Sequence, residues 1–154
     1  MKNALLCLAC ALVFSQSALA QSEIPRFEAG ILLGEPLGLS VKLWYNQFSA
    51  ADASVAWSFT ENGVFEVHAD YILHPLKFDF ENGVLPIYAG LGPALRIGNE
   101  WFIGGRIPVG LSYIFDRLPL SLFGEIAPQW QLLPGNRFVL SGGAGIRIAL
   151  GSAD

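Results

Sequence analysis

The segment VFEVHADYILH, residues 64–74, holds most of the acid–base chemistry that this chain offers. Glu66, His68 and Asp70 stand at alternate positions, and His74 follows four residues later. Carboxylates and imidazoles are common general acids and bases, and they are also metal ligands. Alternate residues of an extended strand share one face. The row is therefore either an active site or the polar face of a structure that is apolar on its other side.

The first 21 residues, MKNALLCLACALVFSQSALAQ, have the features of a secretory signal peptide. A basic residue, Lys2, precedes an apolar run at residues 4–14 and a small-residue site that ends at Ala20. The apolar run is too short to cross a membrane, which takes about 20 residues. We expect residues 1–20 to be cleaved, which leaves one exported domain, residues 21–154.

The composition argues against an ordinary soluble domain. Hydrophobic residues make up 53% of the chain and charged residues only 14%, whereas charged residues are about 25% of typical globular proteins. Both cysteines, Cys7 and Cys10, lie in the leader, so we expect no disulfide or thiolate chemistry in the mature chain. The net charge is −4 for the whole chain and −5 without Lys2, and no basic patch is present for nucleic acid. No uninterrupted apolar run of 18 residues follows the leader.

Hydrophobicity alternates with a period of two along the mature chain, which predicts strands rather than helices. Short connectors rich in Gly, Pro, Asn and Asp separate the alternating segments, as hairpin turns require. We expect eight strands, at residues 26–34, 37–45, 51–59, 64–74, 85–97, 101–115, 120–133 and 137–150.

Each predicted strand has one strongly apolar face and one face of small residues with about one charge. In segment 101–115, for example, Ile107 and Leu111 lie opposite Arg106 and Ser112. A solvated surface would carry roughly a quarter to a third charged residues, so the apolar face is the better candidate for the outside, against lipid. Backbone groups cannot stay unpaired in lipid, so the strands must close. The sequence therefore predicts an all-β fold: an eight-stranded antiparallel up-and-down transmembrane β-barrel with a polar, side-chain-filled interior.

Aromatic residues gather near the ends of the predicted strands, as in the interfacial girdles of membrane barrels. The alternative is that aromatic residues merely favour strands. The residues concerned are Phe27, Trp44, Tyr45, Trp57, Phe59, Trp101, Phe102, Tyr113, Phe115, Trp130 and Phe138.

Several segments together resemble the successive strands of small bacterial outer-membrane β-barrel proteins, akin in architecture to the OmpX and OmpA transmembrane domains. They are GEPLGLSVKLW, HADYILH, PIYAGLGPALRIG, RIPVGLSYIF, LFGEIAPQWQLLP and GGAGIRIAL, and together they cover the mature chain. The resemblance implies an eight-stranded barrel in the outer membrane. It implies no established activity.

A closed barrel of eight strands is just wide enough for its own side chains, so we expect no open pore. Charges inside must be paired and hydrogen-bonded, which predicts one interior network of four cations, five anions and a histidine. Arg96, on the strand next to Glu66, is the expected partner of that carboxylate. The predicted members are Glu28, Lys42, Asp52, Glu66, His68, Asp70, Arg96, Arg106, Glu125 and Arg147.

The enzymatic alternative is a lipid A deacylase or acyltransferase, which needs a serine nucleophile within reach of a histidine base. The chain has no His-x-Ser pair, and the predicted inner face places the histidines beside acids rather than serines. A metal site made by His68, Asp70 and His74 would spread its ligands over about 20 Å of strand. We therefore predict no catalytic residues, no metal and no cofactor.

The predicted function is that of a non-enzymatic integral protein of the cell outer membrane, with a structural or envelope-interaction role. Its expected partners are outer-membrane lipid, lipopolysaccharide and the barrel assembly machinery. The longest connector, residues 75–84, either extends the fourth strand or forms a contact surface for a periplasmic partner. A third alternative for the whole chain is a soluble periplasmic barrel with a hydrophobic ligand.

Overall fold

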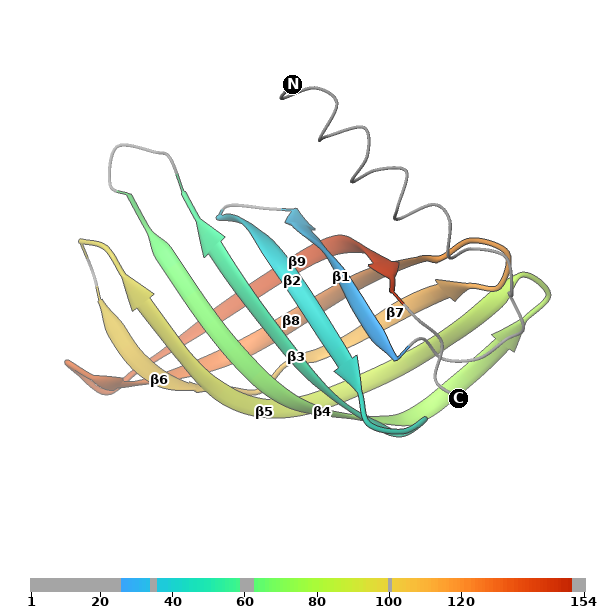
Figure 1. Cartoon of the computed structure of the whole chain (residues 1–154). Coiled ribbons are helices and arrows are strands. Elements are labelled where there is room, and N and C mark those ends of the chain that lie inside the picture. Colours follow the sequence, from blue (N-terminus) through green and yellow to red (C-terminus); the bar gives the residue numbers. More distant parts are fainter. Residues whose placement is uncertain (1–25, 34–35, 59–62, 100, 151–154) are drawn as a thin grey trace, which may run out of the picture.

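The computed structural model describes residues 26–33, 36–58, 63–99 and 101–150, and these residues form one antiparallel sheet (Figure 1). No helix among them is long and apolar enough to cross a membrane. The predicted leader, residues 1–20, lies outside the described residues. The strands are β1 (Phe27–Leu33), β2 (Leu37–Trp44), β3 (Ser49–Trp57), β4 (Phe65–Phe80), β5 (Gly83–Ile97), β6 (Phe102–Arg106), β7 (Val109–Phe115), β8 (Leu120–Leu133) and β9 (Arg137–Ala149).

The sheet closes on itself in a ring. Each strand from β1 to β5 pairs with the next, and β8 pairs with β9. β9 then pairs with β1 from Glu28 opposite Ala149 to Leu33 opposite Ala144. β6 and β7 both lie between β5 and β8, so they follow one another along a single position in the ring. The predicted all-β, antiparallel architecture is confirmed at this level.

The single strand predicted at residues 101–115 is wrong in detail, because the structure divides it into β6 and β7. The break falls at Ile107 and Pro108. Proline has no amide hydrogen and cannot donate to a ladder, so regular pairing stops there. Two isolated backbone bonds bridge the gap: Ile107 N donates to Pro128 O at 2.9 Å, and Gly90 N donates to Pro108 O at 2.9 Å.

The connector at residues 75–84 is a strand extension, the first of the two alternatives for this segment. β4 continues to Phe80 and β5 begins at Gly83, with a two-residue turn between them. The pairing register shifts between Leu73 and Leu76. In Figure 1 the resulting yellow-green hairpin reaches furthest to the right.

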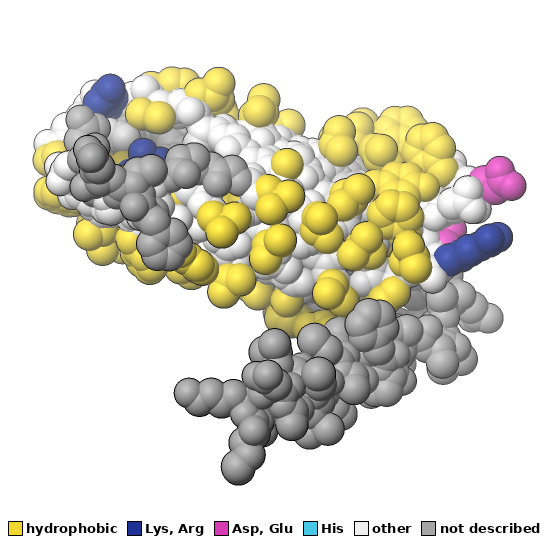
Figure 2. All heavy atoms as spheres, turned by 90° about the horizontal axis from the view of Figure 1, so that it is seen from above, with side chains coloured by type: hydrophobic (Ala, Val, Ile, Leu, Met, Phe, Trp, Pro, Cys, Tyr) yellow, Lys and Arg dark blue, Asp and Glu magenta, His cyan; other side chains and the backbone are white. Residues whose placement is uncertain are grey.

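The polarity of the ring is inverted relative to a soluble protein. Large apolar side chains cover its outer wall, and Leu91, Leu140 and Phe138 are each about two-thirds exposed. On the face that Figure 2 draws, apolar side chains lie along the wall and charged ones gather at the two ends. Many of the largest fully buried side chains are instead polar, such as Glu28 and Arg147. The predicted separation of apolar and polar faces therefore exists, with the apolar face outward.

The predicted aromatic girdle is wrong at two residues. Trp44 and Phe102 are only 4% and 2% exposed, so they point into the ring and not toward its surroundings. Tyr45, Trp101 and Trp130 are well exposed, whereas Phe59 lies outside the described residues. Successive side chains of a strand point to opposite faces, so the place of a residue in this alternation decides whether it points inward, and its nearness to the strand end does not.

Glycines on the inner face make room for large neighbours. Gly110 pairs directly with Tyr88 across β7 and β5. A Cβ atom added at Gly110 would lie 2.6 Å from the Tyr88 hydroxyl oxygen and 2.6 Å from the Gly124 carbonyl oxygen. The ring can therefore bury this tyrosine only while residue 110 has no side chain.

We expect Gly110→Ala to lower the free energy of unfolding by about 1–3 kcal/mol, the usual effect of overpacking. Gly124→Ala, on the neighbouring strand, is the matched control, since nothing lies within 4 Å of its added Cβ. Urea unfolding of the refolded protein in detergent measures both variants. Equal stability of the two variants would contradict the packing described here.

Candidate functional site

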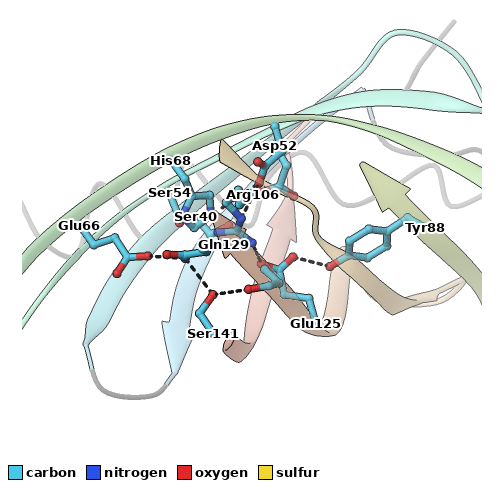
Figure 3. A network of polar contacts seen from close by, with 12 residues as sticks. Ser40, Asp52, Ser54, Glu66, His68, Tyr88, Arg106, Glu125, Gln129 and Ser141 are labelled. Atoms are coloured by element: carbon cyan, nitrogen blue, oxygen red, sulfur yellow. Dashed lines mark hydrogen bonds and ion pairs between the residues drawn. The ribbon is translucent and has the colours of Figure 1, made fainter. Parts of the chain in front are cut away.

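The ten residues predicted for the interior all lie on the inner face of the ring. Eight of them are buried, and the two others, Arg96 and Glu125, are partly buried. The strands direct them inward because each occupies the polar phase of its alternating pattern. Their side chains meet in three groups along the length of the ring, and Figure 3 shows most of the two groups away from the chain termini.

Arg147 holds the central group together. Its Nη2 atom donates to Asp52 Oδ2 at 2.7 Å and to Ser40 Oγ at 2.7 Å, and its Nε atom donates to Ser40 Oγ at 3.1 Å. Its guanidinium carbon also lies 3.7 Å from the ring centroid of Phe123. These contacts join β9 to β2, β3 and β8 across the interior. They leave the guanidinium 1% exposed but hydrogen-bonded and stacked on an aromatic face.

Arg106 forms the second ion pair of this group. Its Nη2 atom makes a short contact with Glu125 Oε1, and its Nε atom lies 3.4 Å from Asp70 Oδ2. The Tyr88 hydroxyl donates to the other Glu125 oxygen at 2.9 Å. The Arg106 guanidinium therefore contacts both the Glu125 and the Asp70 carboxylates, and the Tyr88 hydroxyl adds a hydrogen bond to Glu125. Buried charges need partners of this kind.

Glu66 and Arg96 form the group nearest the turn between β5 and β6. The register places them directly opposite each other, and Arg96 donates to Glu66 Oε2 from Nε at 2.9 Å and from Nη2 at 2.5 Å. Gln129 donates to the other Glu66 oxygen at 3.2 Å and to Ser141 Oγ at 2.9 Å. The partner predicted for Glu66 is the one that the structure places there.

The group nearest the chain termini departs from simple ion pairing. Glu28 lies opposite Lys42 in the register but accepts from Trp44 Nε1 at 2.7 Å and from Ser121 Oγ at 2.5 Å. Lys42 Nζ instead lies 3.0 Å from His74 Nε2, and 4.2 Å from the centroid of the Trp44 ring. A lysine ammonium can donate to a neutral imidazole and also interact with an aromatic face. His74, which the predicted network omitted, is therefore part of the interior.

The expectation that the histidines lie beside acids rather than serines is wrong for His68. Ser54 stands directly opposite His68 in the β3–β4 register, and its Oγ lies 2.7 Å from His68 Nε2. Asp70 Oδ2 lies 3.9 Å from that same nitrogen. A catalytic triad needs the serine and the carboxylate on opposite ring nitrogens. The three residues are near one another but do not have triad geometry, and all three are buried.

No group of three or more His, Cys, Asp or Glu side chains within the described residues is arranged to hold a metal ion. The interior also contains polar partners that the charge pattern did not single out: Ser40, Ser54, Tyr88, Ser121, Gln129 and Ser141. Each lies in the same alternating phase as the charges. The alternating pattern of each strand could therefore have identified these polar partners from the sequence.

Comparisons of this chain with protein-family models, with curated proteins and with solved structures gave no match. The interior network and the apolar wall around it therefore carry the functional argument.

We expect breaking the buried Asp52–Arg147 ion pair to destabilise the ring more than breaking the partly exposed Glu66–Arg96 pair. Removing one member of a fully buried pair typically costs about 3–5 kcal/mol, because the other charge remains buried. Asp52→Asn and Arg147→Met should each fall near that range. The double variant should lose less than the sum, with a coupling of about 0.5–3 kcal/mol. Urea unfolding of the four proteins measures this cycle.

The comparison pair is Glu66 and Arg96, through Glu66→Gln and Arg96→Met. The Arg96 side chain is 28% exposed, so solvent screens the pair and the coupling should be smaller than for Asp52 and Arg147. Additive losses at Asp52 and Arg147, or a stronger coupling at Glu66 and Arg96, would contradict the network as described.

Proposed function

We propose that this chain is a non-enzymatic integral β-barrel protein of the outer membrane, with a structural or envelope-interaction role. The observation that carries the proposal is the inverted polarity of a closed ring, which has large apolar side chains outside and charged side chains inside. In this proposal β6 and β7 together form one of eight membrane-crossing strands.

The free-energy cost of exposing apolar side chains to water supports lipid as the surroundings of the outer wall. Apolar area in water costs about 25 cal/mol per Å² relative to burial, and soluble monomers rarely expose apolar patches of more than a few hundred Å². Here exposed leucine, isoleucine, valine and phenylalanine occur on strands all around the ring. Hydrocarbon removes that cost, and a closed ladder leaves few backbone groups unpaired within it.

The soluble periplasmic barrel with a hydrophobic ligand requires the opposite polarity, with an apolar interior. The interior found here holds ion pairs and hydrogen bonds beside a small cluster of Trp44, Ala50, Ile72 and Tyr88, so it is not the apolar interior that such a ligand would need. The same contacts support a filled lumen rather than an open pore, as expected for a ring of this size.

The signal-peptide features of residues 1–20 and the resemblance to small outer-membrane barrels support export to the outer membrane. Lipid and lipopolysaccharide would then surround the wall, and the barrel assembly machinery would insert it. With the chain termini in the periplasm, the β4–β5 hairpin lies at the periplasmic end and the turn at Asn99 faces the cell exterior.

The protein should be recovered from the outer-membrane fraction, and single cysteines should report the two surroundings. In a background with Cys7 and Cys10 replaced by serine, Leu111→Cys lies on the apolar wall and should be shielded from a water-soluble thiol reagent. Asn99→Cys, in the turn, should react in intact cells. Recovery in the soluble periplasm would contradict the proposal, and labelling of Asn99→Cys only after the outer membrane is opened would reverse the topology.

One observation favours the second candidate, a lipid A deacylase or acyltransferase: Ser54 Oγ lies 2.7 Å from His68 Nε2. We expect His68→Gln to be mild for stability, since an amide keeps a donor and an acceptor for Ser54. We also expect His68→Gln and Ser54→Ala to leave the lipid A mass spectrum of producing cells unchanged. A lipid A change that requires the wild-type protein and disappears in both variants would establish the enzyme instead.

A further inference from the structure

The β4–β5 hairpin extends beyond its neighbour on one side. The regular pairing between β3 and β4 ends at Ser49 opposite Leu73, and one further backbone bond runs from His74 N to Phe48 O at 2.7 Å. Pairing between β4 and β5 continues to Phe80 opposite Gly83, and the other edge of β5 is still paired there, with Phe115 of β7. Among the described residues, β4 therefore has no strand beside it at residues 76–80, which we call the open edge.

The hydrogen-bonding direction along the open edge follows from the turn. A two-residue turn closes on a hydrogen-bonded pair, here Phe80 and Gly83, and antiparallel pairs then alternate between bonded and unbonded. Within residues 76–80, the even-numbered positions direct their amide and carbonyl groups to β5. Lys77 and Asp79 therefore direct theirs away from β5, toward the open edge. Before the register shift the direction is the reverse, since His74 N donates to Phe48 O.

The side chains of the open edge form two sets. Leu76, Phe78 and Phe80 lie on the outer face and are 54%, 48% and 55% exposed. Lys77 and Asp79 alternate with them on the other face. Edge strands are commonly protected from pairing with other chains by lysine residues and by being short. Three large exposed apolar side chains on the same segment instead favour such pairing. Open edges are not stable in hydrocarbon, so on the proposed function this segment lies outside it, where apolar side chains favour a partner.

We propose that the open edge binds an extended peptide segment of another protein as an added antiparallel strand. Main-chain hydrogen bonds from Lys77 and Asp79 would supply affinity, and the flanking side chains would supply specificity. Read from its N-terminus, the segment carries a basic, an apolar and an acidic residue. In an antiparallel pair these stand opposite Asp79, Phe78 and Lys77, so that each charge meets its opposite.

A second copy of this chain fits less well, and this step rests on the proposed function. Two copies inserted the same way in one membrane present β4 in parallel rather than antiparallel. Their two-fold symmetry would place Lys77 opposite Lys77 of the other copy, and like charges directly opposite are unfavourable.

The test uses two labelled peptides with the same composition. One contains Val-Lys-Leu-Asp-Val, which matches the edge in antiparallel register without copying residues 76–80, and the other exchanges its lysine and aspartate. Fluorescence anisotropy with the folded full chain in detergent should show the first peptide binding about tenfold more tightly, because two ion pairs replace two like-charge contacts. The double variant Lys77→Asp with Asp79→Lys should reverse the preference.

Asp79→Pro tests the backbone contribution. It removes an amide hydrogen from the open edge without touching the bonds of Phe78 and Phe80 to β5, so both peptides should lose binding while the ring stays folded. Equal binding of the two peptides, no binding of either, or an unchanged preference in the charge-exchanged variant would overturn the proposal. So would efficient disulfide dimers of Phe78→Cys in the Cys7→Ser and Cys10→Ser background, which would assign the edge to a second copy. Membrane fractionation is independent of these readouts, so the two proposals fail separately.

Discussion

Closure of the backbone hydrogen-bond ladder is the constraint on which the rest of the structure depends. Unpaired amides along the edges of a sheet are costly wherever water does not reach them, and the pairing of β9 with β1 closes the sheet into a ring. Closure also fixes the alternating register, because a shift of one residue in any strand would exchange its apolar and polar faces. Among the described residues, the ladder is interrupted at Pro108, and it is one-sided at residues 76–80 of β4 and at residues 137–143 of β9, which extend beyond their neighbours β3 and β1.

Once the ring closes, the inner face has to be filled from its own side chains. Four cations and five carboxylates are buried or partly buried on this inner face, so their arrangement must give each charge a partner. The structure achieves this with residues from several strands at once. Arg147 reaches Asp52 and Ser40, Arg106 bridges two acids, and Lys42 finds an imidazole and aromatic rings in place of a carboxylate. Glycine opposite Tyr88 shows that apolar bulk is fitted into the same space.

Periodicity predicted the antiparallel strands and their two faces because alternation is a local property of each segment. It also gave the Glu66–Arg96 pair, since those residues lie on adjacent strands. Other features depend on register, which no single segment encodes. Ser54 meets His68 because the β3–β4 register places them directly opposite each other, and Lys42 turns from Glu28 to His74, which lies two strands away on β4. The break at Pro108 was readable from the missing amide hydrogen, and the inward direction of Trp44 from its phase beside Lys42.

Quenching of single tryptophans tests most directly whether the apolar wall faces hydrocarbon. Trp130 is 56% exposed on the wall, whereas Trp44 is 4% exposed inside the ring. Two variants, each retaining one of them with the other three tryptophans replaced by phenylalanine, would be reconstituted into bilayers of lipids brominated on the acyl chains. We expect strong quenching of Trp130 by bromine with little quenching by acrylamide in the water, and weak quenching of Trp44 by either. Quenching of Trp130 by acrylamide but not by brominated lipid would contradict this expectation.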